Sequence, residues 1–254
     1  MIELLKVLVC MPFLLYSCYS DIKTRRVSNR VWPLMLAAGS VFVLYDLFTY
    51  GPSYFFRMVL SFVLIFLFVY LLFYLNAFGG ADAKVMMVIS ILIPIFPAIE
   101  LFEKSFPIWG IPPIDMFAFS VFGNSVILTV IVPLGLFLFN LTHLPLSEIL
   151  RKPFYTFVGY KCQVSDLKGK HIRLMEVYEE NDGVVTSRFS RGGTKIDEDV
   201  ISRLEGYEKR NLIDSKVWVT PGLPFMIPIT AGFITSVVFG DVIFYLTMKY
   251  LLMF

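Results

Sequence analysis

The sequence predicts an α-helical polytopic membrane protein with six transmembrane helices and a small α+β cytoplasmic domain inserted between helices five and six. The 254 residues are 57% hydrophobic and 17% charged, against about 25% charged residues in soluble domains. Runs such as 58–75 carry no charge over the roughly 18 residues that indicate a span. Charged residues gather instead at about 146–220. The net charge of +2 gives no reason to expect nucleic-acid binding.

Six apolar segments divide the chain: about 2–19, 31–49, 55–75, 84–98, 116–140 and 223–248. The fourth is short and begins in a glycine turn, so its start is expected in a polar pocket, because free backbone is costly in lipid. The first is interpreted as a span and not as a signal peptide, since basic charge follows the apolar run instead of preceding it. The expected domains are a membrane domain, a cytoplasmic domain and a last helix: residues 1–145, 146–220 and 221–254.

The charged segment is expected to form a hairpin, a short helix and one further strand. Its alternating patterns predict strands at 171–179, 184–189 and 216–219, with a turn at 181–183. Thr194 is expected to cap the helix, whose apolar face carries Ile196, Val200 and Leu204. The stretch "RGG" (191–193) lacks the P-loop pattern and is interpreted as a turn.

Basic residues in short loops predict the orientation. The loop at 20–30 holds four of them, whereas the second loop offers only Arg57 and the long connection at 99–115 only Lys104. Short loops rich in Lys and Arg face the cytoplasm. Counting spans then places 76–83 and the charged domain in the cytoplasm, with both termini outside.

Four aspartates border apolar segments, and the span count sorts them by membrane face. Asp21 and Asp82 fall on the cytoplasmic face, while Asp46 and Asp241 fall some 25–30 Å away on the other. Each aspartate could simply mark a helix boundary and pair with a nearby cation. Two on one face, one of them in a glycine turn, instead favour a site.

A pair of carboxyl groups at hydrogen-bonding distance cannot easily lose both protons, so the two share one. One then deprotonates water while the other polarises a peptide carbonyl, and the pair titrates as a unit without individual assignment. Gly79 and Gly80 beside Asp82 suit the close approach of a substrate strand to the backbone.

The stretches "DIKTRRVSN" (21–29) and "GGADAK" (79–84), with "TPGLPFMIP" (220–228), resemble the GxGD intramembrane aspartic peptidases. The likeness is to archaeal preflagellin (prearchaellin) peptidases, relatives of type IV prepilin peptidases. It implies Asp21 and Asp82 as the catalytic pair of an aspartic endopeptidase, preflagellin or pilin-like precursors as substrates, and no metal or organic cofactor. Ala81 replaces the second glycine of the motif and loses its positive-φ freedom. The chain lacks a tetra-cysteine segment, so N-methylation is not expected.

The prolines of "TPGLPFMIP", Pro221 and Pro224 among them, set a helix start or leave a backbone edge for an extended substrate. His143 and His171 lack neighbours at metal-ligand spacing and are expected to pack at interfaces. A proton-coupled transporter and a non-enzymatic scaffold remain alternative functions. Nothing in the sequence indicates an oligomeric state. The resting site is expected to be open, with its carboxyl groups apart and a hinge at Gly79 and Gly80 that closes on the precursor.

Overall fold

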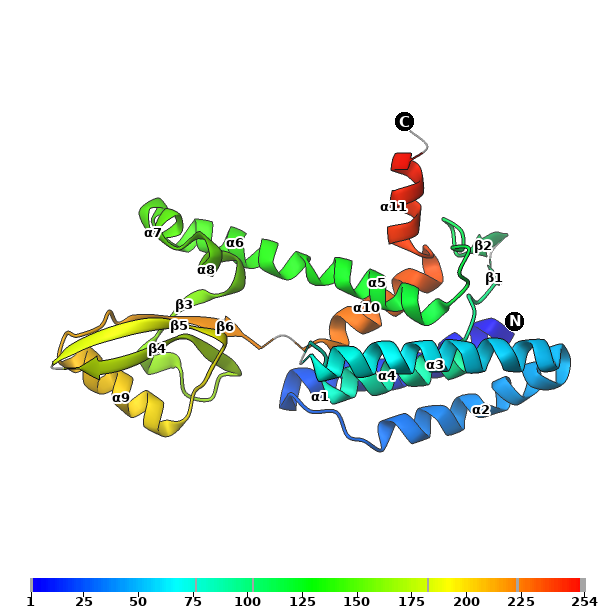
Figure 1. Cartoon of the computed structure of the whole chain (residues 1–254), viewed down its shortest axis with the longest axis horizontal. Coiled ribbons are helices and arrows are strands. Elements are labelled where there is room, and N and C mark those ends of the chain that lie inside the picture. Colours follow the sequence, from blue (N-terminus) through cyan, green and yellow to red (C-terminus); the bar gives the residue numbers. More distant parts are fainter. Residues whose placement is uncertain (1, 76, 102, 182, 223, 252–254) are drawn as a thin grey trace. The chain divides into compact units, whose positions relative to one another are not determined.

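The structure, a computed structural model, describes residues 2–75, 77–101, 103–181, 183–222 and 224–251 (Figure 1). The chain divides into two compact units. The first comprises Met1–Thr129 and Pro224–Phe254, and the second comprises Val130–Leu223. The turn expected at 181–183 lies partly outside the described residues.

The first unit is almost entirely helical. Its elements are α1 (Ile2–Thr24), α2 (Val31–Tyr50), α3 (Pro52–Tyr74), α4 (Gly80–Leu92), the hairpin β1 (Ile99–Leu101) and β2 (Lys104–Phe106), α5 (Phe117–Thr129), α10 (Met226–Val238) and α11 (Val242–Leu251).

Four helices are long and apolar enough to cross a membrane: α1, α2, α3 and the continuous stretch Phe117–His143. The pair α10 and α11, bent by 57°, makes a fifth span if it counts as one. The chain is therefore a multi-pass membrane protein with four to five candidate spans. The expected fourth span is the 13-residue helix α4, shorter than the about 20 residues that a span needs.

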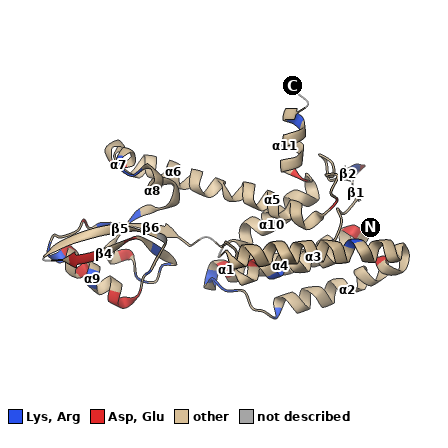
Figure 2. Cartoon of the chain, viewed as in Figure 1, with Lys and Arg blue, Asp and Glu red and all other residues tan. Residues whose placement is uncertain are grey.

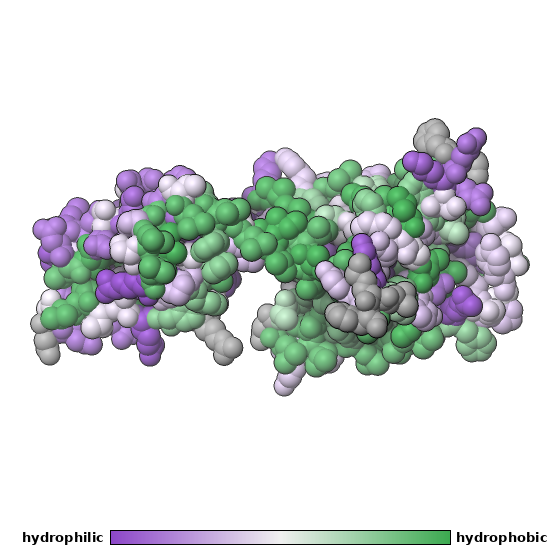
Figure 3. All heavy atoms as spheres, turned by 90° about the horizontal axis from the view of Figure 1, so that it is seen from above, coloured by the Kyte–Doolittle hydropathy of each residue, from purple (hydrophilic) through white to green (hydrophobic). Residues whose placement is uncertain are grey.

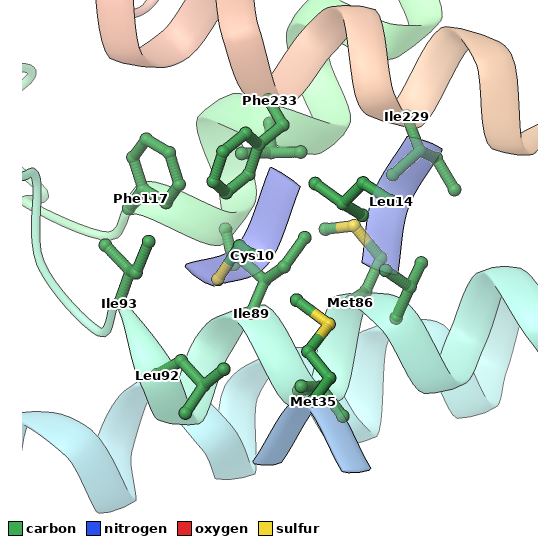
Figure 4. Close-up of a cluster of buried hydrophobic side chains, with 14 of the residues drawn as sticks. Cys10, Leu14, Met35, Met86, Ile89, Leu92, Ile93, Phe117, Ile229 and Phe233 are labelled. Carbon is green, nitrogen blue, oxygen red and sulfur yellow. The ribbon is translucent and has the colours of Figure 1, made fainter. Parts of the chain in front are cut away.

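Helix α4 lies at the centre of the first unit rather than at its surface. Its buried side chains pack against residues of α1, α2, α5 and α10 (Figure 4). Met86, Ile89 and Leu92 are among the most completely buried side chains of the protein. Because α4 has protein on most sides, its ends need not meet lipid, and a helix too short to span is stable there.

The break between α10 and α11 is held from α5 by one buried amide. Asn124 donates to Ser236 Oγ (2.8 Å) and the Gly240 carbonyl (2.9 Å), and accepts from the Val242 N–H (3.1 Å). Gly240 has a φ of +93°, which favours glycine. The last apolar segment, expected as a single helix, is thus two helices with satisfied backbone groups at their junction.

The described residues of the second unit form four α-helices, a 3-10 helix at Val164–Asp166 and a four-stranded antiparallel sheet. The helices are α6 (Ile131–His143), α7 (Leu146–Arg151), α8 (Pro153–Val158) and α9 (Glu198–Lys209). The strands β3 (Tyr160–Gln163), β4 (Ile172–Asn181), β5 (Val184–Lys195) and β6 (Lys216–Pro221) have the spatial order β3-β6-β4-β5.

The three predicted strands are confirmed as β4, β5 and β6, and the predicted helix is α9. Thr194 as its cap was wrong: Asp197 caps α9 by accepting the Val200 N–H at 2.9 Å. The "RGG" stretch does not end the strand but lies inside β5, where Gly192 and Gly193 have positive φ. The opposite strand shifts register between Leu174 and Glu176, so the glycines accommodate a bulge.

Candidate active site

Asp21 lies in the last turn of α1, opposite the first turn of α10. Its Oδ2 accepts a hydrogen bond from the Met226 N–H at 3.3 Å. Cys18, one turn earlier, lies 3.3 Å from the Met226 carbonyl and 3.0 Å from Thr230 Oγ1. The free N–H groups of a helix N-terminus attract negative charge, so the N-terminus of α10 stabilises the Asp21 carboxylate.

Asp82 occupies the first turn of α4 and folds back onto the turn before it. Its Oδ2 accepts the Gly79 N–H at 3.0 Å, as an acidic side chain at the third helical position does in a capping box. Gly79 has an ordinary φ of −79°. A Cβ on Gly79 would lie 2.9 Å from Asp82 Oδ2, so a side chain there would displace the Asp82 carboxylate from its present position.

Burial raises the pKa of Asp82 to about 6, even though the Gly79 N–H lowers it, and the nearby Asp21 carboxylate raises it further. Asp82 lies outside the helices that are long enough to span a membrane. The repulsion by Asp21 means that the fold brings the two carboxyl groups into electrostatic reach of each other. A carboxyl group with this pKa retains its proton in the range where an acid catalyst needs it.

Two aromatic rings connect the ends of α4 and α10 that carry these contacts. The buried Phe78, directly before the glycine turn, packs edge-on against Phe225 with ring centroids 5.3 Å apart. Phe225 precedes Met226, whose N–H binds Asp21. Neither ring was predicted from the sequence to belong to the site. The only signal was an aromatic residue inside each conspicuous turn, at "FGGAD" and "PFM".

The first loop also reaches α4 directly. Lys84 Nζ donates to Asn29 Oδ1 at 2.7 Å, which joins the last residue of "DIKTRRVSN" to the last residue of "GGADAK". Lys23 Nζ donates to Tyr19 OH at 3.3 Å. In the described part of the chain neither aspartate has an ion-pair partner, so these lysines do not provide the cations of the helix-boundary interpretation.

In this structure the carboxyl groups of Asp21 and Asp82 are not hydrogen-bonded to each other in the described part of the chain. Across the described residues each accepts a backbone N–H, and no hydrogen bond joins Asp21 to Asp82. An open resting site predicts this arrangement. Each backbone contact uses only Oδ2, so the two residues share one proton when an oxygen of one carboxyl group comes within hydrogen-bonding distance of the other.

The motif-supporting residues have different local roles. Gly80 begins α4, and the nearest atom to a Cβ there would be Phe73 Cε2 at 4.0 Å, so this position has room for a side chain. Ala81 lies inside the helix, where positive φ is not needed, which explains why alanine is accommodated. Pro224 precedes α10 in the first unit, while Pro221 ends β6 in the second, opposite Ile172.

The other two aspartates have structural partners. Asp46 of α2 forms a buried ion pair with Lys6, which lies near the end of α1 opposite Asp21. Asp241 accepts from Ser120 Oγ at 2.5 Å and from the Phe244 N–H at 2.8 Å, as the cap of α11. The Lys6 partnership was missed in the sequence, although a lysine within an apolar helix was its signal.

No metal centre is found among the described residues: no three His, Cys, Asp or Glu side chains gather there. His143 stacks on Phe139, with 4.0 Å between ring centroids. A cavity of about 790 Å³ lies in the second unit. Several of its charged residues form pairs, Lys152 with Glu176 and Lys161 with Glu148, and none of its lining residues is a predicted catalytic or motif-supporting residue.

A multi-pass helical unit with Asp21 and Asp82 at helix ends, the latter with a raised pKa, is the arrangement expected of a membrane peptidase of the aspartic class. Residues 8–134 match the type IV leader peptidase family, and residues 151–242 match the archaeal peptidase A24 C-terminus, type II. The chain belongs to the type IV leader peptidase family, and it is a membrane aspartic peptidase that cleaves leader peptides. Nothing in these comparisons supports the transporter alternative.

Similar proteins cover nearly the whole chain. A preflagellin peptidase of Methanococcus voltae is 27% identical over 242 residues, which are 90% of this chain and 92% of the relative. Preflagellin peptidases of Methanocaldococcus jannaschii and Methanococcus maripaludis are 22% and 23% identical. Each alignment spans 90% of this chain, with 91% and 92% of those relatives.

Proposed function

We propose that Asp21 and Asp82 form the catalytic dyad of this leader peptidase. The observation that carries the proposal is the raised pKa of Asp82, to which the Asp21 carboxylate contributes. Of the four aspartates at the ends of apolar segments, these two act on each other without a neutralising cation in the described part of the chain. Asp46 has Lys6, and Asp241 has Ser120 and the α11 backbone.

The dyad works with one shared proton. The ionised carboxyl removes a proton from a water molecule as its oxygen attacks the scissile carbonyl carbon. The protonated carboxyl donates to the carbonyl oxygen, where negative charge develops. The proton is then available to the leaving amine. The two roles belong to the pair, so neither aspartate alone is named acid or base.

The substrates are preflagellins or related pilin-like precursors, cut before their apolar helix. Support comes from the three relatives, all named preflagellin peptidases, and from the family match. Gly79 and Gly80 are exposed at the start of α4, where the absence of side chains leaves the backbone open to an extended strand. Pro221 and Pro224 belong to the stretch "TPGLPFMIP", which supports substrate binding in this proposal.

The site faces the cytoplasm of the cell membrane, and six apolar segments build the membrane domain with α4 as an internal one. The basic residues of the loop that follows Asp21 support this orientation. The same loop contacts α4, because Lys84 donates a hydrogen bond to Asn29. The sheet-containing domain is cytoplasmic in the same arrangement.

Incubation of the detergent-solubilised protein with a preflagellin tests the function. The expected result is a shortened substrate with a new N-terminus directly before the apolar helix, as read by mass spectrometry. The Asp82→Asn protein, prepared in parallel, controls for contaminating peptidases. An uncleaved precursor with a folded, detergent-dispersed enzyme would contradict the proposed substrate, and cleavage by Asp82→Asn would contradict the dyad.

A further inference from the structure

The helices α7 and α8 carry an outward apolar stripe directly after a membrane span. The span Phe117–His143 ends two residues before the cap of α7. Each of the two short helices carries two large exposed side chains about one helical turn apart, on either side of the break at Lys152. They are Leu146, Leu150, Phe154 and Phe157, with exposed fractions of 65%, 71%, 60% and 36%.

The opposite side of the same two helices faces the protein. Ile149 of α7 and Thr156 of α8 are buried, whereas Phe154 of the stripe is 60% exposed and touches Phe189 of β5 only edge-on at 6.0 Å. The outward stripe is therefore not a frayed segment but one side of a packed element. Contiguous apolar surface of this kind marks an interaction site.

Helix α8 is fixed alongside the last turns of α6. The Asn140 side chain donates to the carbonyl oxygens of Thr156 (2.8 Å) and Gly159 (2.7 Å). Phe137 and Phe157 stack with ring centroids 4.4 Å apart and planes within 2°. At about 1.5 Å per helical residue, Phe137 lies roughly 9 Å before the end of α6. The α8 helix thus returns to a depth inside the end of the span.

The apolar stripe on α7 and α8 continues the apolar surface of α6, and this continuity indicates which partner covers the stripe. The lipid-exposed positions of α6 itself are apolar, and the exposed side chains Ile131, Leu134, Leu138 and Leu141 continue along the helix. Figure 3 shows hydrophobic residues gathered over α6 and the helices after it. Arg151, the last residue of α7, is exposed and has no ion-pair partner among the described residues.

We propose that Leu146–Val158 is an interfacial membrane anchor, with its apolar stripe in the acyl boundary and Arg151 among the lipid phosphates. Amphipathic helices of this kind lie about 5–10 Å deep in the headgroup and acyl boundary, which matches the depth at which Phe137 and Asn140 hold α8. Lys152 pairs with the buried Glu176 of β4, so the anchor is linked rigidly to the sheet. The anchor fixes the sheet-containing domain at the membrane surface.

Site-directed spin labelling in lipid nanodiscs tests the anchor without relying on cleavage. Labels are placed through Leu150→Cys and Phe154→Cys, with Ser202→Cys on the polar helix α9 as the matched exposed control. The unmutated protein, labelled in parallel, measures the background from its native cysteines. The expected ratio of collision with oxygen to collision with a water-soluble nickel chelate is several-fold higher at 150 and 154 than at 202.

Equal ratios at the three positions would overturn the anchor. Two other occupants have distinct signatures. A defined label-to-label distance between copies carrying Leu150→Cys, measured by dipolar spectroscopy in liposomes, would assign the stripe to a second copy of the chain. Loss of oxygen collisions on adding a precursor would assign it to the substrate. Either result would replace the lipid surface as the partner.

Discussion

Helix α1 carries charged residues near both ends, and the surroundings of these charges differ: one is paired with an opposite charge and the other is not. Near its start, Lys6 is 3% exposed and pairs with Asp46, which is 1% exposed, and with Glu3 at 2.8 Å. Near its end, Asp21 faces a second acid, and in the described part of the chain only backbone N–H groups bind the two carboxylates. Figure 2 shows how few other charges the helices of this unit carry.

The comparison separates structural charge from chemical charge. Lys6 and Asp46 neutralise each other, so removing one partner leaves the other as a buried charge, which is a cost to the fold. Asp21 raises the pKa of Asp82, so the fold gains nothing from ionising both acids, and one proton is retained up to about pH 6. In the proposed site the two acids lack a cation in the described part of the chain, whereas Asp46 has one and makes a helix contact.

The largest expected effect is on the acidic end. Asp21→Asn and Asp82→Asn should each lower the rate of leader removal by at least about a thousandfold, because half a dyad cannot both activate water and polarise the carbonyl. The double variant should be no slower than either single one. Initial rates with a preflagellin measure this, with thermal unfolding as the control for folding. Substantial turnover by either single variant would remove that aspartate from the mechanism.

The ion-paired end should respond in stability and not in chemistry. Asp46→Asn leaves Lys6 with the partly exposed Glu3 alone and should lower the free energy of unfolding by about 3–5 kcal/mol. The specific activity of the folded variant should stay near that of the unmutated protein at low temperature. Thermal unfolding in detergent and cleavage rates measure the two separately.

A double variant at the Lys6–Asp46 ion pair complements the measurement on Asp46→Asn. Lys6→Met with Asp46→Leu removes both charges and should recover most of the lost stability, because an apolar pair costs no desolvation. A folded but inactive Asp46→Asn protein would mean that the two ends of α1 are not separable. Unchanged stability would mean that Glu3 alone satisfies Lys6.

Space at Gly79 gives a smaller effect at the catalytic end. In Gly79→Ala the new Cβ meets Asp82 Oδ2 at 2.9 Å, so the carboxylate must move. A displacement near 1 Å costs about a hundredfold in kcat/KM. Gly80→Ala is the matched control, because its Cβ finds no neighbour nearer than 4.0 Å. Equal rates for the two variants would show that the Gly79 contact does not position Asp82.

The smallest effect is the pH dependence of kcat/KM. Because the pKa of Asp82 is raised to about 6 beside Asp21, the pair holds a proton below that pH and loses it above. The free enzyme's kcat/KM should therefore fall about tenfold per pH unit on the alkaline side. The alkaline fall in kcat should lie at a higher pH than the fall in kcat/KM, because bound substrate excludes water and desolvation raises the pKa of the carboxyl pair. A kcat/KM that instead rises through pH 6 to a plateau would contradict the shared proton.

Much of this could be predicted from the sequence because it depends on local properties. Apolar length predicts spans, and α1, α2 and α3 are confirmed. Alternating residues predict strands, and β4, β5 and β6 are confirmed. A glycine turn before an apolar run placed Asp82 at a helix start, as α4 shows. Each of these patterns is decided by the residues of one segment and its solvent.

Other features were decided only when distant segments packed together. Nothing near Asp46 in the sequence indicates Lys6, and nothing near Asp21 indicates the Met226 N–H. The break between α10 and α11 depends on Asn124 of α5. A short helix such as α4 is stable because α1, α2, α3, α5 and α10 pack around it. Sequence alone thus determined which residues carry charge in an apolar chain, and the tertiary structure decided which charges are neutralised, since neutralisation requires a partner within a few ångströms.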